Sequence, residues 1–203
     1  MGVKRASAST DASGSTRRVL AALEDLGLLL EQDRELPNVV TLVTGDAPRS
    51  SWWSHPKGRL VFAVLSRLAE HEDVLFTKLL ARKVTLVHRR LWPSLLAVAR
   101  EHAAWQMRGL SRAARQILAK SEEGAHEASG KAVQSLAARL LVHTEEVHTE
   151  SGRHALRVES WDEWARRRRV RAERSLLRAR RTLEEAASAL GAEPGALPWP
   201  GEN

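Results

Sequence analysis

The sequence contains no cysteine and no tyrosine, and only two of its 203 residues are phenylalanine. Without cysteine, the chain has neither disulfide bonds nor thiolate ligands for a metal ion. No apolar run approaches the roughly 18 residues that predict a membrane-spanning helix. The first fifteen residues also lack the apolar centre of a secretion signal. We therefore expect a protein of the cytoplasm without a membrane partner.

Arginine provides most of the positive charge. The chain has 32 lysine and arginine residues against 25 aspartate and glutamate residues, a net charge of +7, and only six of the basic residues are lysine. The planar guanidinium group binds phosphates and base edges bidentately. This balance favours an anionic partner such as nucleic acid. The alternative is the arginine-rich composition of proteins from GC-rich genomes, which indicates no function.

Apolar spacing predicts a helical N-terminal domain over residues 16–110, after a disordered tail at residues 1–15. The first helix, expected to reach residue 32, is marked by apolar residues at intervals of three and four: Val19, Leu23, Leu26 and Leu30. Shorter helices are predicted at residues 37–44, 57–70, 74–80 and 93–105. Residues 84–87 are mostly β-branched and are predicted to be extended, and a strand is the alternative at residues 37–44.

Residues 111–160 have the sequence shape of a winged helix, in which helices precede a two-stranded hairpin. Ser111 is a predicted N-cap, Gly124 ends the first helix, and Gly130 precedes a second helix at residues 131–140. The segment between the two glycines is too short for the positioning helix that a winged helix normally has there. The helix-turn-helix is therefore predicted to be truncated.

A hairpin is predicted after the second helix, with strands at residues 140–149 and 153–160. Its register is open, because Arg157 faces Glu146 in one alignment and Glu145 in the other. The glutamates of the first strand would repel phosphate. They therefore favour a protein partner for the hairpin itself.

Residues 161–190 are predicted to form one long basic helix, and residues 191–203, which contain three prolines, a second disordered tail. Apolar residues in the helix alternate at spacings of four and three: Ala172, Leu176, Ala179, Leu183, Ala186 and Leu190. Because this seam covers only about two and a half heptads, it is expected to pack within the chain. The predicted fold is mainly α with a small β-hairpin.

Three groups of side chains are candidate DNA contacts. The second helix of the winged-helix segment has polar and basic residues away from its apolar face, where they suit base edges or phosphates: Lys131, Gln134, Ser135 and Arg139. The hairpin tip offers Arg153 and His154. The last helix offers a run of arginines suited to phosphates: Arg166, Arg167, Arg168 and Arg169. The alternative for each group is a solvated surface.

No pattern of catalytic, metal-binding or cofactor-binding residues is present, and no cofactor is expected. His143 and His148 are an odd number of positions apart on the predicted strand, so they point to opposite faces and are not expected to share a metal. Residues 124–132 do not form a phosphate loop, because the glycine spacing is one residue too long and alanine replaces the Mg²⁺-binding hydroxyl. Trp52 and Trp53 are expected to fill the core and cap a helix, with stacking on a base or a partner as the alternative.

Several segments spread over residues 20–165 share a family resemblance: 74–80, 83–87, 91–96, 110–111, 114–118, 140–142, 146–149 and Trp161. They are similar to those of the AlkZ-related bacterial proteins, which are relatives of the winged-helix DNA glycosylases that unhook interstrand crosslinks. The resemblance implies a winged-helix fold and a link to DNA repair. The Gln-x-Gln or Gln-x-Asp catalytic motif of those enzymes is missing, because no glutamine is followed two positions later by glutamine or aspartate: Gln32, Gln106, Gln116 and Gln134.

The leading hypothesis is a non-catalytic winged-helix protein that binds DNA in repair or regulation. The first alternative is a protein-interaction adaptor, in which the arginines only keep the protein soluble. One continuous basic face would favour DNA, whereas arginines scattered among glutamates would favour the adaptor. The third hypothesis is a diverged DNA glycosylase, which a deep pocket lined by Trp52, Trp53 and a carboxylate would favour.

Overall fold

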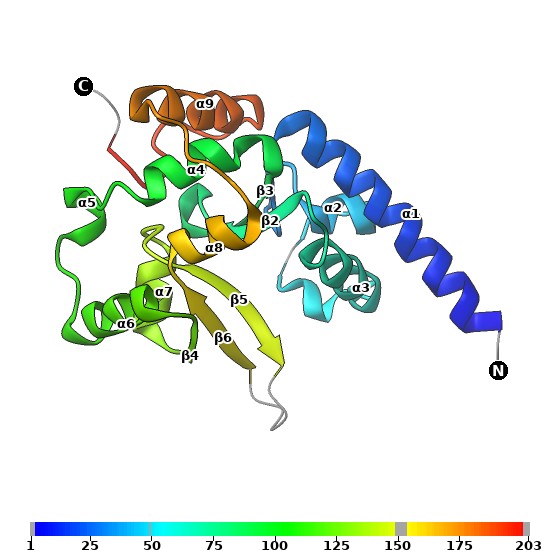
Figure 1. The fold of residues 1–203 in the computed structure, drawn as a ribbon. Coiled ribbons are helices and arrows are strands. Elements are labelled where there is room, and N and C mark those ends of the chain that lie inside the picture. Colours follow the sequence, from blue (N-terminus) through cyan, green and yellow to red (C-terminus); the bar gives the residue numbers. More distant parts are fainter. Residues whose placement is uncertain (1–2, 49, 149–153, 201–203) are drawn as a thin grey trace.

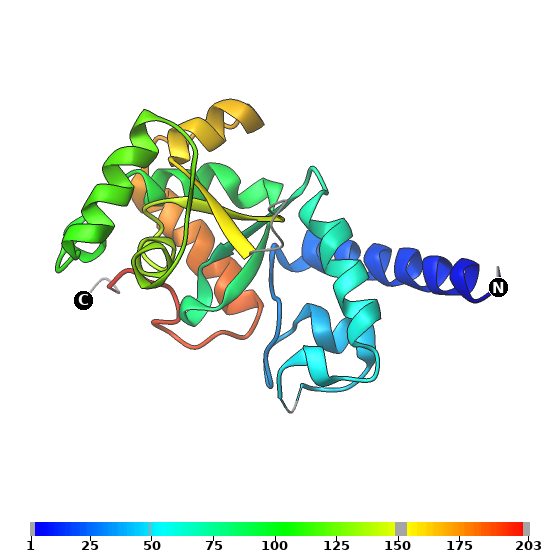
Figure 2. The ribbon, with the colours of Figure 1, turned by 90° about the horizontal axis from the view of Figure 1, so that it is seen from below.

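The computed structural model describes residues 3–48, 50–148 and 154–200 (Figure 1). Helices predominate in these residues, as expected, and the strands form two antiparallel sheets of three strands each. The predicted hairpin is therefore only one part of the β structure. Figure 2 shows that the N-terminal part of the first helix, α1 (Val3–Leu26), projects away from the rest of the molecule.

The first unit is built around a sheet with β3 at its centre. Its elements are α1 (Val3–Leu26), β1 (Leu28–Leu30), α2 (Val39–Thr44), α3 (Gly58–Ala69), β2 (Val74–Lys78) and β3 (Val84–His88). The strand order is β1-β3-β2. Leu86 of β3 lies opposite Leu29 on one side and Phe76 on the other, so three apolar side chains cross the sheet at one level.

Local features explain where two helices of this unit begin and end. α1 ends before Gly27, whose φ of +81° suits glycine and where a Cβ atom would lie 2.9 Å from the Arg90 guanidinium group. The Asn38 side chain caps α2 by accepting a hydrogen bond from the Thr41 amide at 2.9 Å. The helix predicted at residues 37–44 is therefore confirmed, and the strand alternative is wrong.

Two strands of the first sheet correct predicted helices. The helix expected to reach residue 32 ends at Leu26, and residues 28–30 pair with β3. The helix expected at residues 74–80 is instead β2, which also pairs with β3. Both segments are short apolar runs that periodicity alone does not assign. Pairing with residues 84–88, which are extended as predicted, decides their conformation.

The second unit repeats the strand order of the first. Its elements are α6 (Arg112–Glu123), β4 (His126–Ala128), α7 (Lys131–Ala137), β5 (His143–His148) and β6 (His154–Glu159), with β6 between β4 and β5. The Ser111 side chain accepts a hydrogen bond from the Ala114 amide, which confirms the predicted cap. The segment between Gly124 and Gly130 contains the unpredicted strand β4, whose three residues carry no recognisable alternation.

Strand pairing settles the register of the hairpin. Glu145 lies opposite Arg157, and Glu146 lies opposite Leu156. The alignment that pairs Glu146 with Arg157 is therefore wrong. On the other side of β6, Glu127 also lies opposite Arg157, so this arginine is placed between two glutamates.

The chain leaves the first unit through α4 (Trp92–Ala99) and α5 (Ala104–Met107) and returns to it through α8 (Trp161–Arg168) and α9 (Leu176–Ala189). The single helix predicted at residues 161–190 is wrong, because Arg169 adopts a left-handed conformation with φ of +55° and ends α8. The Glu173 amide donates to the Pro93 carbonyl at 2.9 Å, which fixes the connection on α4. α9 lies against α4 (Figure 1), and its apolar seam packs within the chain as predicted: Ala179, Leu183, Ala186 and Leu190.

Both predicted disordered tails contain ordered structure. α1 begins at Val3, and Ala12 and Ser15 are buried. At the other end, Trp199 is buried, and its indole N–H donates to the Glu184 carboxylate at 2.9 Å. Small residues and prolines suggest disorder, but burial of apolar surface against the core offsets the entropy lost on ordering.

Two hydrophobic cores result, and the larger one is built from both ends of the chain. Helices α1 to α4, the first sheet, α8, α9 and Trp199 share this larger core. The smaller core lies within the second unit: Leu110, Ala114, Leu118, Val133, Leu136, Leu141, Val142 and Val158. The C-terminal helix that was predicted as a separate region therefore belongs to the first unit, and the second unit is an insertion between α4 and α8.

Candidate functional site

The residues predicted to contact a DNA groove lie together at one surface depression beside α7. Lys131, Gln134, Ser135 and Arg139 line it with Arg82, and its volume is about 590 Å³. Arg82 belongs to the short turn η2 (Leu80–Arg82), which connects β2 to β3 in the first unit. None of the described residues that line this α7 depression is a carboxylate, so its charge is positive. Sequence analysis missed Arg82 because the turn is distant in the chain.

Only part of this positive charge is available to a ligand. The Arg139 guanidinium group donates to the carbonyl oxygens of Gln106, at 2.9 Å, and Arg108, so it holds the segment after α5 against α7. Arg82 and Lys131, by contrast, are exposed and form no ion pair with a described residue. These two cations, one from each unit, are the ones free to contact an anion.

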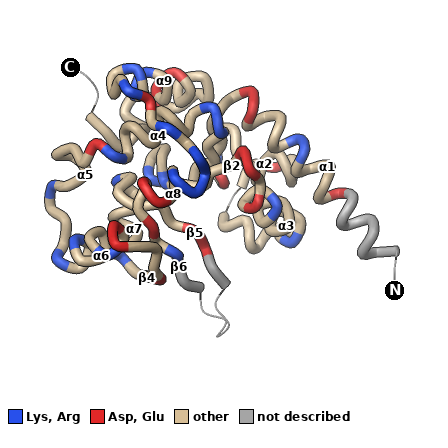
Figure 3. Tube along the Cα trace, viewed as in Figure 1, with Lys and Arg blue, Asp and Glu red and all other residues tan. Residues whose placement is uncertain are grey.

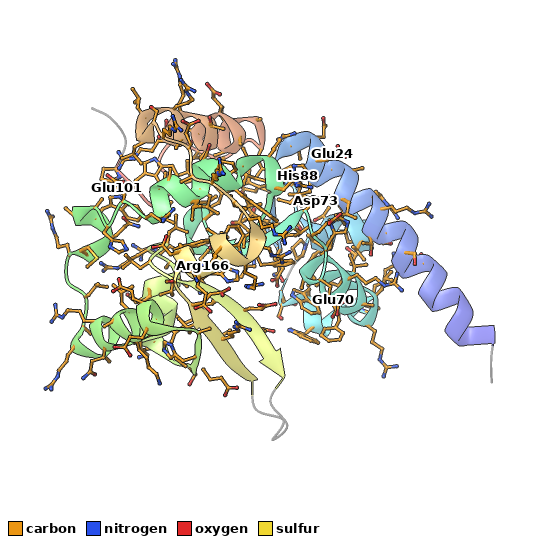
Figure 4. All side chains as sticks on the ribbon, in the orientation of Figure 1. Glu24, Glu70, Asp73, His88, Glu101 and Arg166 are labelled. Carbon is orange, nitrogen blue, oxygen red and sulfur yellow. The ribbon has the colours of Figure 1, made fainter. Side chains whose placement is uncertain are left out.

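The four consecutive arginines do not form a row. Arg167 donates to the buried carboxylate of Glu159, and Arg168 lies 5.8 Å from the centre of a tryptophan ring of α4. Arg166, which is labelled in Figure 4, and Arg169 are exposed. They line a second depression of about 550 Å³ with Arg100, Arg171 and Asp162.

Arginines around α8 and α9 are interspersed with carboxylates (Figure 3). The ion pairs in this region are Arg100–Asp162, Arg167–Glu145, Arg167–Glu159, Arg178–Glu173, Arg180–Glu101 and Arg181–Glu185. Paired surface arginines attract a polyanion less than free ones do. This region therefore combines paired arginines with Arg166, Arg169 and Arg171, which form no ion pair with a described residue, whereas the described lining of the α7 depression contains cations and no carboxylate.

The predicted contacts at the hairpin tip fall at the edge of the described residues. Arg153 lies outside them, and for His154 only the main chain, at the start of β6, is described. His148 is likewise described by its main chain alone, opposite His154 in the hairpin. Of His143 and His148, the two histidines that are not expected to share a metal, only His143 has a described side chain.

A cleft of about 470 Å³ lies between the two units and is lined by residues from both. The first unit contributes Trp52, Trp53, Phe62, Phe76 and Glu31, and the second contributes His143, Glu145 and Glu146. α8 closes it with Trp164, Arg167 and Arg168. We call it the central cleft. The lining expected for the third hypothesis, two tryptophans and a carboxylate, is therefore present.

The aromatic end of the central cleft is formed by a short turn before α3. Trp52 and Trp53 begin this turn, η1 (Trp52–Ser54). Trp52 is buried in the core as predicted, whereas Trp53 is 66% exposed and stacks on Trp52 with ring centres 4.0 Å apart. Phe62 of α3 lies 5.6 Å from Trp53, centre to centre. A Cβ atom at Gly58 would lie 3.1 Å from the Trp52 carbonyl oxygen, so glycine allows the turn to approach α3.

Glu31 follows β1 and lies at this aromatic end. The Trp52 indole N–H donates to its carboxylate at 2.9 Å. Burial raises the pKa of Glu31 above its ordinary value, the Trp52 hydrogen bond opposes that rise, and the charge of Glu146 adds to it. Glu31 and Glu146 come from different units and form no ion pair with a described residue. Their proximity had no signal in the sequence.

A buried polar network adjoins the cleft at His143. Its Nδ1 atom lies 2.9 Å from the carboxylate of Glu159, which also accepts a hydrogen bond from Arg167. Burial acts to raise the pKa of Glu159, but the hydrogen bonds and charges of His143 and Arg167 lower it below its ordinary value. Trp161 and Trp164 pack against the imidazole, with ring centres 5.6 and 5.9 Å away. The network therefore fixes the orientation of His143 at the edge of the cleft.

Comparisons of the chain with models of protein families, with curated proteins and with solved structures gave no match. Within the described part of the chain, no group of three or more histidine, aspartate or glutamate side chains is placed to hold a metal ion. None of the described helices has both the length and the apolar character needed to cross a membrane. The functional argument therefore depends on the α7 depression and the central cleft.

Proposed function

We propose that the protein binds double-stranded DNA through two winged-helix-like units and contacts the phosphates at the α7 depression. The main support is the repeated order of elements. In each unit a helix precedes the first strand, at least one helix precedes the hairpin, and the third strand lies between the other two. A winged helix has this topology. The first unit has two helices, α2 and α3, before its hairpin, whereas the second has only α7 and is truncated.

The free charges of the α7 depression support the same contact. Arg82 lies in the connection between the hairpin strands of the first unit, and Lys131 begins the second helix of the other unit. One phosphate backbone at the depression would therefore contact both units. Because each phosphate contact releases counterions, such binding weakens steeply as salt rises.

The proposal is tested by fluorescence anisotropy with a labelled duplex over a series of salt concentrations. The variant combines Arg82→Ala with Lys131→Ala, and the control combines Arg178→Ala with Arg181→Ala, which removes the same charge from paired arginines of α9. A plot of log affinity against log salt has a negative slope. We expect the magnitude of this slope to decrease by about 1.8 in the variant, because two phosphate contacts are lost. The control is expected to keep the wild-type slope.

Two results would overturn the proposal. One is the absence of duplex binding by the wild type at low salt, which would leave the adaptor hypothesis. The other is an equal loss of slope in the variant and the control, because that would assign binding to total charge and not to the α7 depression. Circular dichroism of both variants checks that the fold is retained.

A second candidate function is removal of a damaged base from DNA. The observation that favours it is the set of Trp52, Trp53 and Glu31 at the central cleft. The test is release of free base from alkylated duplex by the wild type and by Glu31→Gln. Release that is lost in the variant would support the candidate, and no release by the wild type would contradict it.

A further inference from the structure

We infer that the central cleft is a binding site for a planar organic cation. The ligand is a free small molecule, so the inference does not depend on the DNA contact proposed above. Three features of the cleft indicate this ligand: its size, its exposed aromatic side chains and two carboxylates, Glu31 and Glu146, that form no ion pair with a described residue.

The size and position of the cleft suit a small aromatic molecule. Its volume of about 470 Å³ lies within the range of about 300–1,000 Å³ that is usual for small-molecule sites. It also lies between two units of the chain, where such sites are common. A ligand there would contact η1 and α3 of the first unit and β5 of the second.

The aromatic side chains at the cleft are unusually exposed. Trp53 is 66% exposed and Phe62 is 44% exposed, although the adjacent Trp52 is buried. These rings form a continuous wall, because Trp53 stacks on Trp52 and lies next to Phe62. A planar ligand that stacked on Trp53 would cover apolar surface that water now contacts, and a positive charge would be attracted to the face of the indole.

The carboxylates at this end of the cleft lack positive partners. The Glu31 carboxylate accepts only the Trp52 N–H among its described contacts, and Glu146 forms no ion pair with a described residue. The cationic side chains that line the cleft contact groups other than Glu31 and Glu146. Lys78 donates to an amide side chain of α7, and Arg168 faces a tryptophan of α4. Arg167 donates to the buried carboxylate of β6 and lies 3.9 Å from the Glu145 carboxylate.

An anionic ligand is disfavoured by the same geometry. It would lie against Glu31 and Glu146, whose charges already repel each other. A cationic ligand would instead favour the ionised form of Glu31 and oppose the effect of burial on its pKa. Trp52 and Glu146 are the groups that act on Glu31. The other titratable or charged groups that line the cleft are Lys78, His143, Glu145, Arg167 and Arg168.

The inference is tested by isothermal titration calorimetry of the nuclease-treated full chain with N-methylacridinium. Neutral acridine and anthracene-9-carboxylate are the comparison probes, because they keep three fused aromatic rings and carry no charge and a negative charge, respectively. We expect saturable binding of one N-methylacridinium per chain and much weaker binding of the other two. Equal binding of acridine, preferred binding of the carboxylate, or no binding of the cation would each overturn the inference.

Variants then locate the site. Glu31→Gln keeps an acceptor for the Trp52 N–H but removes the charge, so N-methylacridinium affinity is expected to fall about tenfold. Trp53→Ala removes the stacking surface and is expected to weaken binding by about three- to thirtyfold. Glu185→Gln makes the same charge change on α9 and is expected to leave affinity unchanged. A site elsewhere would leave both cleft variants at wild-type affinity.

The pH dependence separates a charged contact from a purely structural role of Glu31. Wild-type affinity is expected to fall as acid protonates Glu31, because its attraction for the cation is then lost. In Glu31→Gln this part of the pH dependence is absent. Equal pH profiles for the two proteins would contradict the role assigned to Glu31.

Discussion

Replacement of Glu159 by glutamine tests whether one buried carboxylate connects the two units. Glu159 ends β6 in the second unit, and its partner Arg167 lies in α8, which packs in the larger core. Glutamine keeps the volume of the side chain but removes the charge. Its amide nitrogen would also replace a buried oxygen that has no hydrogen-bond partner among the described residues.

The expected loss of stability follows from the burial of this pair. Removing one partner of a buried ion pair costs about 3–5 kcal/mol. The Arg167 side chain is 38% exposed, so water recovers part of its solvation, and we expect a loss of about 2–4 kcal/mol in the free energy of unfolding. His143, which lies almost wholly buried beside the carboxylate, loses its charged acceptor as well.

The loss should depend on pH with a definite sign. The pKa of Glu159 is lower in the folded protein than its ordinary value of 4.5. Its stabilising contribution is therefore complete above that ordinary value and disappears as pH falls through the lower folded value. The difference in stability between the wild type and Glu159→Gln is expected to be largest near neutral pH and to shrink in acid.

Urea unfolding followed by tryptophan fluorescence provides the measurement, at neutral pH and in acid. Glu185→Gln, in an exposed ion pair of α9, is the control and is expected to have wild-type stability. A loss for Glu159→Gln of less than about 1 kcal/mol at neutral pH would refute the reasoning. A loss of constant size at both pH values would show that packing, and not charge, is responsible.

Two further changes test other parts of the fold. Trp199→Ala is expected to lower the free energy of unfolding in urea by about 3–5 kcal/mol, because it leaves a cavity in the larger core and removes the hydrogen bond to Glu184. Trp199→Phe should lose clearly less stability. Wild-type stability of both variants would contradict the packing described for this segment. Gln106→Ala removes three hydrogen bonds of a fully buried side chain, including one to the Arg139 carbonyl. At about 1 kcal/mol for each bond, it is expected to lower thermal and urea stability by about 3 kcal/mol, and a loss below about 1 kcal/mol would contradict that role.

Sequence reasoning succeeded where neighbouring residues determine the structure. Ser111 caps α6 and Gly124 ends it because capping depends on the residues next to the helix end. The same is true of α7, where helical spacing places Lys131 and Gln134 on the exposed side. These predictions required no knowledge of distant contacts.

Sequence reasoning failed where distant residues decide. Leu28–Leu30 continues the helical spacing of α1, and only pairing with β3 makes it a strand. The break at Arg169 precedes the apolar repeat that starts at Ala172, and neither proline nor glycine marks it. The central cleft depends on Glu31 and Glu146, whose proximity exists only after the second unit is placed against the first.

The division of the larger core between the two ends of the chain determines the order in which the protein can fold during synthesis. All residues of the smaller core emerge from the ribosome before α9 and Trp199 emerge. The second unit can therefore complete its contacts first, although it follows most of the first unit in the sequence. Until the last residues emerge, the larger core exposes the apolar surface that α9 later covers. In this period the nascent chain is most susceptible to aggregation and to chaperone binding.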